Sequence, residues 1–373
     1  MTIAVNTCSP FSDDSSGCDD FIFSCFSGLA EKYPQHQFIY IFDGPFNKKY
    51  ITAENITGVI AGRSLLRQYW YNFKLPTLLK KHKVTVLVNT GHACSLRTKV
   101  PQCFVIQDLS FLYTPQFFPK DHLRYYKKFM PKFLLKAKNI VTFSQFSRLA
   151  IIEKYKTGEE KIDTVYPGVS ENFKPIDESV KEQIKEKYTE GKEYFLYSGV
   201  IHPRKNLVML LKAFSFFKKR QKSNMQLVIT GQDDGSYEEF TTGLKTFKFR
   251  DEVKLLGPLP QEELILITAA AYAFVYPSLY EDFALPPLQA MQCGVPVIAS
   301  NTGALPEICD EAVLYANPCD FNDIAEKMML LFKDENIKKN LAEKGILRAQ
   351  EFNLEKAIGL LWLSVLKCAR PVN

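Results

Sequence analysis

Short apolar runs alternate with amphipathic stretches along the whole chain, and this alternation predicts a parallel α/β architecture. In the first half the runs that we expect to form strands are 2–5, 37–42, 84–89, 102–107 and 139–144. In the second half they are 194–200, 225–231, 253–257, 273–277 and 295–300. Each half has enough strands for its own doubly wound sheet.

Residues 165–194 are polar, rich in Lys and Glu, and contain two prolines, which predicts a domain linker and a surface helix. We therefore expect an N-terminal domain over 1–175 and a C-terminal domain over 176–352. The last stretch, from 352 to 369, has the pattern of an amphipathic helix and no strand follows it. We expect 353–373 to be a C-terminal helix that packs back on the N-terminal domain.

Bulk composition indicates an ordinary globular protein of about two domains, with 46% hydrophobic and 24% charged residues in 373. No apolar run reaches the roughly 18 residues of a membrane-spanning helix, and the polar start has no signal-peptide pattern. Nine cysteines without a Cys-x-x-Cys pair predict reduced thiols in the cytoplasm. A net charge of +6 favours anionic substrates or a membrane surface, and is too weak to predict nucleic-acid binding.

Residues 277–300, PSLYEDFALPPLQAMQCGVPVIAS, carry the most specific chemistry. An apolar strand ends at Pro277, and a helix is expected to open on Pro286-Pro287 and to close at Gly294. Glu281 lies in the loop before this helix, and Gln289 follows eight positions later in its first turn. A helix N-terminus favours a phosphate, and a carboxylate beside it suits sugar hydroxyls. The segment therefore predicts a nucleotide-sugar site.

A second candidate is the loop after 194–200, in which Gly199 ends a strand and Arg204-Lys205 precede a helix expected from about Leu207. A guanidinium and an ammonium at a helix N-terminus suit a diphosphate. Alone, the pair reads more simply as solvated basic residues, and Glu281 as an exposed loop carboxylate. Their occurrence on one sheet, with an apolar stretch at 283–285, favours the ligand site.

The chain resembles the retaining glycosyltransferases of family GT4. The motifs that carry the resemblance are, in order, QDLSFLYTPQFFP, NIVTFSQFSR, VYPGVSENF, YFLYSGVIHPRKNL, VKLLGPLPQEEL, the 277–308 run and DEAVLYANPCD. The resemblance implies the GT-B fold, in which two Rossmann-like domains face a central cleft. It implies an N-terminal acceptor domain, a C-terminal nucleotide-sugar domain, and retaining transfer of a hexose to a carbohydrate or lipid-linked acceptor. It also implies no metal and no cofactor, and the sequence contains no Asp-x-Asp metal motif.

The resemblance also assigns roles to individual positions. Arg204 and Lys205 would neutralise the donor diphosphate, and Glu281 would hold hydroxyls of the donor sugar. The remaining donor-side positions are Gly17 with Ser16, Gly199, Pro258 and Leu259 beside the base, Asp282, the backbone amides of Phe283, Ala284 and Leu285, and Gln289 at the ribose. On the acceptor or sugar side stand Gln107 and Asp108, and Asp108 could equally be a polar residue in an ordinary turn.

Four positions depart from the family pattern. Gln289 replaces a Glu, Asp282 and Ala284 replace glycines, and Gln107 replaces a His. His92, after the strand at 84–89, is a candidate for the missing His, although most lone histidines have no such role. An alternative function is therefore a diverged GT-B module that binds a nucleotide-sugar or a partner transferase without turnover.

Residues 120–138, KDHLRYYKKFMPKFLLKAK, mix basic and aromatic residues. This pattern fits a peripheral membrane contact that recognises a lipid-linked acceptor on the inner face of the membrane. A helix with a core stripe and solvated lysines explains it too.

Overall fold

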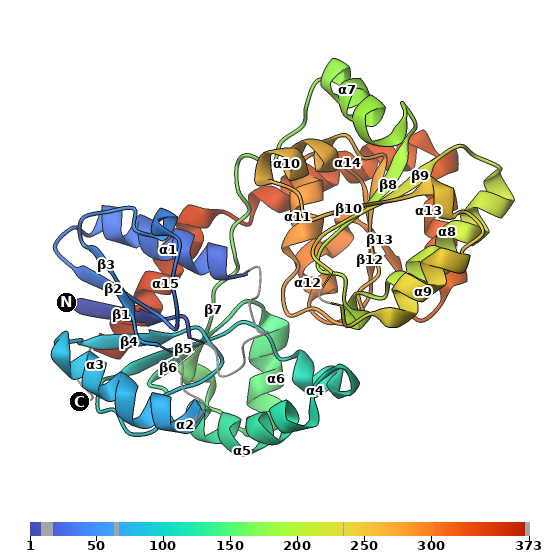
Figure 1. Cartoon of the computed structure of the whole chain (residues 1–373). Helices are drawn as coiled ribbons and strands as arrows, with labels where there is room; N and C mark the ends of the chain where they lie inside the picture. Colours follow the sequence, from blue (N-terminus) through green and yellow to red (C-terminus); the bar gives the residue numbers. More distant parts are fainter. Residues whose placement is uncertain (9–17, 63–66, 234, 370–373) are drawn as a thin grey trace. The chain divides into compact units, whose positions relative to one another are not determined.

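The computed structural model describes residues 1–8, 18–62, 67–233 and 235–369, with only the backbone of 18–20 and 67, and it forms two compact units (Figure 1). Unit 1 comprises Met1–Gly168 and Asn353–Asn373, and unit 2 comprises Val169–Phe352. The boundary expected near Pro175 lies a few residues inside unit 2.

Unit 1 is built on a sheet whose seven described strands are all parallel. Their order is β3 (Ile56–Ile60), β2 (Gln37–Phe42), β1 (Thr2–Asn6), β4 (Val86–Asn89), β5 (Gln102–Ile106), β6 (Asn139–Thr142) and β7 (Ile162–Thr164). The inner strands are apolar and buried, as expected where helices cover both faces of a parallel sheet. The strand order reverses direction between β1 and β4.

Helices on both sides of this sheet complete unit 1. They are α1 (Cys18–Lys32), α2 (Arg67–Tyr69), α3 (Leu75–Lys81), α4 (Ser110–Tyr113), α5 (Lys120–Lys136), α6 (Gln145–Tyr155) and α15 (Leu354–Ala369), with a π-helical turn over Trp70–Lys74. The last of these, α15, packs on α1 and on β4, β5 and β6 (Figure 1). Ser364 and Lys367 of α15 both donate hydrogen bonds to the carboxylate of Asp163 in β7.

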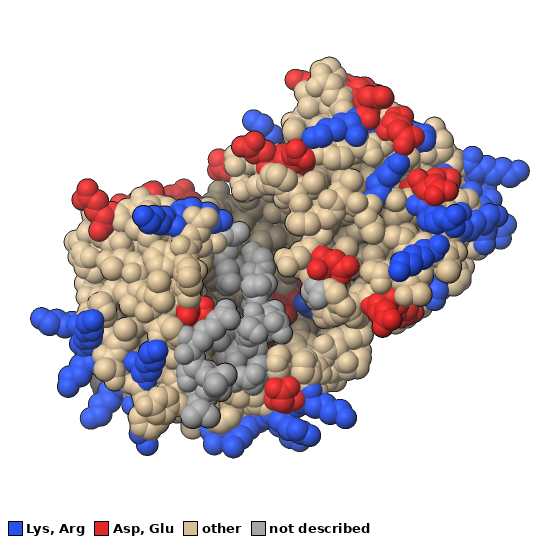
Figure 2. All heavy atoms as spheres, viewed as in Figure 1, with Lys and Arg blue, Asp and Glu red and all other residues tan. Residues whose placement is uncertain are grey.

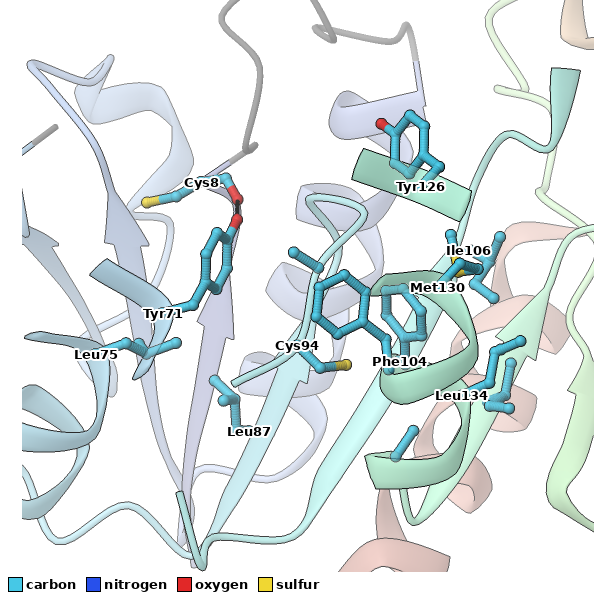
Figure 3. Packing of buried hydrophobic residues seen from close by; sticks show 14 of the residues in the cluster. Cys8, Tyr71, Leu75, Leu87, Cys94, Phe104, Ile106, Tyr126, Met130 and Leu134 are labelled. Carbon is cyan, nitrogen blue, oxygen red and sulfur yellow. Dashed lines mark hydrogen bonds between the residues drawn. The ribbon is translucent and has the colours of Figure 1, made fainter. Parts of the chain in front are cut away.

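One hydrophobic core cluster of unit 1 lies between the sheet and α5 and α3. Phe104 and Ile106 of β5 pack against Met130 and Leu134 of α5 (Figure 3). At the other end of this cluster the buried Tyr71 hydroxyl donates to the carbonyl of Cys8, at 2.5 Å. Because Tyr71 finds this acceptor, a polar group is buried without the loss of a hydrogen bond.

Unit 2 contains a second parallel sheet, of six described strands. Their order is β10 (Val253–Gly257), β9 (Gln226–Thr230), β8 (Tyr194–Ser198), β11 (Ala273–Tyr276), β12 (Val297–Ser300) and β13 (Leu314–Ala316). The helices are α7 (Glu178–Thr189), α8 (Leu207–Gln221), α9 (Glu238–Thr246), α10 (Gln261–Ala269), α11 (Leu285–Gln292), α12 (Leu305–Cys309), α13 (Phe321–Lys333) and α14 (Glu335–Gln350).

The fold confirms the α/β prediction of two doubly wound parallel sheets, and every strand predicted from the sequence is present. Three strands were not predicted, namely β3, β7 and β13, and each lies at the edge of its sheet. In the described part of the chain no helix has the length and apolar character needed to cross a membrane.

Candidate functional site

The predicted site residues of unit 2 meet where the strand order reverses. β8 and β11 are neighbours in the sheet, although they are far apart in the chain. From this pair, the strands that follow β8 in the chain are added on one side of the sheet, and those that follow β11 are added on the other. The loop after β8 carries Arg204 and Lys205, and the loop after β11 carries Glu281. Because both strands are parallel, both loops leave the same edge of the sheet. This reversal is the place where open α/β sheets bind ligands.

The loop after β8 is shaped by its own side chains. The His202 ring nitrogen Nδ1 accepts a hydrogen bond from the Arg204 N–H at 3.1 Å, at the start of a 3₁₀ turn over Pro203–Lys205. Asn206 then adopts a left-handed conformation with φ of 63°. Its amide donates to the carbonyls of Pro277, at 3.0 Å, and Pro318, at 2.8 Å. Asn206 therefore fixes the Arg204-Lys205 turn against the loop that carries Glu281, and α8 begins at Leu207 as predicted.

Arg204, Lys205 and Glu281 form one charged cluster. Lys205 Nζ lies 2.5 Å from Glu281 Oε1 and 3.0 Å from the Tyr276 hydroxyl. Arg204 Nη1 lies 3.8 Å from Glu281 Oε2 and donates to the Tyr280 carbonyl at 3.3 Å. The side chains are only 6% exposed for Glu281, 11% for Lys205 and 18% for Arg204. Glu281 is thus a buried, paired carboxylate rather than an exposed loop charge.

Two tyrosines lie under the cluster, and both remain protonated. Burial, followed by the negative charge of Glu281, raises the pKa of Tyr276 well above its ordinary value. Burial likewise raises the pKa of Tyr197, against a smaller lowering by the Lys205 charge. Their rings are stacked at 5.9 Å between centroids. Each hydroxyl therefore acts as a neutral hydrogen-bonding group.

The Glu281 loop is held by backbone contacts on both sides. The Leu279 N–H donates to the Arg204 carbonyl at 2.9 Å, and the Ala304 N–H donates to the Glu281 carbonyl at 2.8 Å. Gly303 has a φ of +61°, and a Cβ there would lie 2.5 Å from the Glu281 carbonyl oxygen. The loop can take this position only because residue 303 has no side chain.

Asp282 lies in the same loop, where the resemblance implies glycine. Its carboxylate is buried and accepts a hydrogen bond from the Tyr280 hydroxyl at 2.9 Å. Phe283 and Ala284 are buried too, and Leu285 begins α11. The carboxylate that stands in place of the expected glycine therefore has a hydrogen-bond partner within its own loop.

The helix α11 ends as predicted, with Gly294 in a left-handed conformation at φ of +72°. It begins at Leu285, one residue before the predicted prolines, so that Gln289 falls in its second turn, half-buried, rather than in its first. Because Pro286 and Pro287 have no N–H, fewer donors face the loop than a helix N-terminus usually offers.

The other donor-side positions lie at the same edge of the sheet. Pro258 and Leu259 follow β10, and Gly199 follows β8. A Cβ placed on Gly231 would lie 1.9 Å from the Gly199 carbonyl oxygen. The backbone at the ends of β8 and β9 therefore approaches too closely for a side chain at residue 231. Gly17 and Ser16 lie outside the described residues.

The unit 1 candidates lie at the carboxyl edge of the first sheet. Gln107 follows β5, and its amide donates to the Thr90 carbonyl, in the loop after β4, at 3.0 Å. His92, in that same loop, is buried with a φ of 58°. Asp108 Oδ1 accepts from the Ser110 N–H at 2.5 Å, which is a turn contact of the kind that Asp commonly makes. The structure therefore brings Gln107 and His92 into adjoining loops and gives Asp108 a local structural contact.

The sequence reasoning did not single out Tyr276, Asn206 or Gly303. Tyr276 reads as one more aromatic residue in an apolar strand, and Gly303 as a loop glycine. Only the left-handed preference of Asn after Arg-Lys offered a signal. A cavity of about 640 Å³ lies elsewhere, at the amino edge of the second sheet between α7 and α14, and no predicted site residue lines it.

Residues 179–348 match the model of the glycosyl transferases group 1, and residues 29–173 match that of glycosyltransferase family 4. O-antigen chain mannosyltransferase B of Escherichia coli is 33% identical over 78% of this chain and 73% of its own length. O-antigen chain mannosyltransferase RfbU of Salmonella typhimurium is 29% identical over 72% of each.

Among solved structures, Anabaena Alr3699/HepE in complex with UDP and glucose superposes with a TM-score of 0.79. The alignment covers 98% of this chain and 99% of that one at 14% sequence identity, which shows a shared fold. The two sheets and this likeness identify the fold as GT-B. Its sequence relatives and the two matched family models show that the chain belongs to the family 4 glycosyltransferases.

Proposed function

We propose that the protein transfers a hexose from a nucleoside-diphosphate sugar to a carbohydrate or lipid-linked acceptor, with retention of configuration and without a metal ion. The observation that carries the proposal is the Arg204–Lys205–Glu281 cluster at the strand-order reversal of unit 2. The two cations can bind a diphosphate, and the carboxylate beside them can bind sugar hydroxyls.

In this proposal, the bound donor takes the place of the ion pairs that Arg204 and Lys205 form with Glu281. The diphosphate takes up the positive charges of Arg204 and Lys205, and Glu281 accepts hydrogen bonds from the sugar. As the bond from the sugar to the diphosphate breaks, negative charge grows on the leaving oxygen, and the two cations stabilise it. The acceptor hydroxyl attacks from the same face, and a phosphate oxygen takes its proton. Such a reaction needs charge stabilisation and positioning rather than a protein nucleophile.

The names of the relatives suggest which donors to test. Two sequence relatives are named as mannosyltransferases, and the structural relative was solved with UDP and glucose. GDP-mannose and UDP-glucose are therefore the first donors for calorimetric titration, followed by ADP-glucose. Failure of all three to bind would overturn the proposal. Binding without turnover on a broad acceptor panel would favour the alternative of a diverged module.

Glu281→Gln tests the role of the carboxylate. We expect transfer to fall by about 100-fold or more, because a charged hydrogen-bond acceptor is lost at the sugar. Glu193→Gln is the matched control, since Glu193 also pairs with a buried lysine, Lys185, at 2.8 Å, but at the amino edge of the sheet. Equal losses in both variants would contradict the assigned role.

We also propose peripheral contact with the inner face of the membrane through α5. The helix exposes Lys127, Lys128 and Lys132, and its Leu135 side chain is 82% exposed. Figure 2 shows Lys and Arg gathered over the side of unit 1 that carries α3 and α5. A basic face with an exposed apolar residue suits anionic headgroups. The described cysteines from Cys25 onward are free thiols, which supports a cytoplasmic location.

Vesicle co-sedimentation tests this contact. Charge reversal of Lys127, Lys128 and Lys132 to Glu should abolish binding to vesicles with anionic lipid. Reversal of the exposed Lys212, Lys219 and Lys222 around α8 is the control and should leave binding unchanged. Binding that persists in the first variant would leave α5 with the simpler role of a solvated helix.

A further inference from the structure

Tyr276, the last residue of β11, lies directly against the charged cluster. Its hydroxyl accepts a hydrogen bond from Lys205 Nζ at 3.0 Å, and the same ammonium lies 2.5 Å from Glu281 Oε1. After burial, the negative charge of Glu281 is the largest cause of the raised pKa of Tyr276, so this charge acts on the same hydroxyl. One neutral hydroxyl thus binds the cation of the pair and lies close enough to the anion to be affected by its charge.

The Tyr276 ring is held rigidly. It is 2% exposed, and it stacks on Tyr197 of β8 and on Phe274 of its own strand, with centroid separations of 5.9 and 6.0 Å. Both partners belong to central strands of the sheet. A hydroxyl fixed in this way restricts where the Lys205 ammonium can lie.

We propose that Tyr276 is a positioning residue for sugar transfer, whose hydroxyl holds the Lys205 ammonium beside the Glu281 carboxylate in the geometry that receives the donor. The inference rests on the proposed function. When Glu281 turns from Lys205 to the sugar hydroxyls, Tyr276 remains as the protein partner of Lys205. The ammonium then stays aimed at the diphosphate instead of following the carboxylate.

Tyr276→Phe removes the hydroxyl and keeps the stacked ring, so the fold should survive. We expect kcat/KM for the donor to fall by about 10- to 100-fold, the range for lost hydrogen bonds to charged groups. Most of the loss should appear in kcat, because a misplaced Lys205 fails chiefly where leaving-group charge develops. Tyr194→Phe, at the amino end of β8, is the matched control: it also loses one buried hydroxyl, whose partner is the Ile267 carbonyl at 2.6 Å, and should keep near-normal turnover.

A double-mutant cycle with Glu281→Gln separates positioning from a general structural effect. If Tyr276 acts through the pair, Tyr276→Phe should cost much less in the Glu281→Gln background than in the wild type. Additive losses, or equal losses in the Tyr276→Phe and Tyr194→Phe variants of an active enzyme, would overturn the inference alone. A wild type without donor binding would instead overturn the proposed function, and the inference with it.

Discussion

Because Lys205 and Glu281 form a buried ion pair, we expect substitutions of these two residues to affect stability and activity differently. The two side chains are 11% and 6% exposed, and their charged atoms are 2.5 Å apart. Removing one member of such a pair leaves a buried charge without its partner, at about 3–5 kcal/mol. Lys205 alone would still contact the Tyr276 hydroxyl, and Glu281 alone would still lie 3.8 Å from Arg204, so we expect the lower end, about 3 kcal/mol. For a domain the size of unit 2 this corresponds to about 6–12 °C in Tm.

The experiment compares Lys205→Met, Glu281→Met and the double variant. Each single variant should unfold at a lower temperature by circular dichroism. The double variant should recover most of this loss, because two unbranched apolar side chains of similar length can pack where the ion pair was. Transfer should be lost in all three, since the donor needs both charges.

Two results would refute this reasoning. If the double variant lost the sum of the two single losses, the charges would not be coupled in the folded protein. If a single variant melted at the wild-type temperature, the remaining charge would be solvated, and the pair would not be buried in solution.

Three further predictions concern residues around the site and the C-terminal helix. Asn206→Gly keeps the left-handed turn but removes both amide hydrogen bonds, and should lower the free energy of unfolding in urea by about 1–3 kcal/mol and weaken donor binding in a titration. Gly303→Ala should displace Glu281 and reduce transfer, whereas Gly359→Ala in α15, where a Cβ meets nothing within 4 Å, should be harmless or stabilising in the same assay and melt. Burial tends to raise the pKa of Asp163, but hydrogen bonds from Lys367, Asn139 and Ser364 outweigh it and lower that pKa. The stabilisation is therefore present above the ordinary carboxyl pKa and is lost as the pH falls through the lowered value, so that Asp163→Asn should destabilise at pH 7 and converge with the wild type in acid melts.

The strands that the sequence failed to predict share a physical reason. Inner strands of a parallel sheet are buried on both faces and read as apolar runs, so each of them was predicted. The edge strands β3, β7 and β13 have only part of their length buried and include Thr, Gly, Asp or Tyr. Pattern alone cannot separate such segments from loops. β10 is also an edge strand, and its apolar VKLLG was enough to predict it.

The candidate site was predicted residue by residue but not as a geometry. Arg204, Lys205 and Glu281 were named from local motifs, and the structure brings them into contact. The roles of the donor-side and acceptor-side residues stay predictions, and Gly17 lies outside the described residues. The expected first-turn position of Gln289 was wrong by one helical turn, because α11 begins at Leu285.

By itself, the sequence determined the features that depend on neighbouring residues: apolar strands, the turn before α8, the proline-led start and glycine-ended close of α11, and the family motifs. Only the tertiary structure decided that β8 lies beside β11, which brings Lys205 to a carboxylate 76 positions away in the chain. It also decided that Tyr276, one aromatic residue in an apolar strand, faces the pair. The physical reason is that strand order and burial come from long-range packing, in which every residue of a sheet takes part, whereas a motif records only the chain on either side of it.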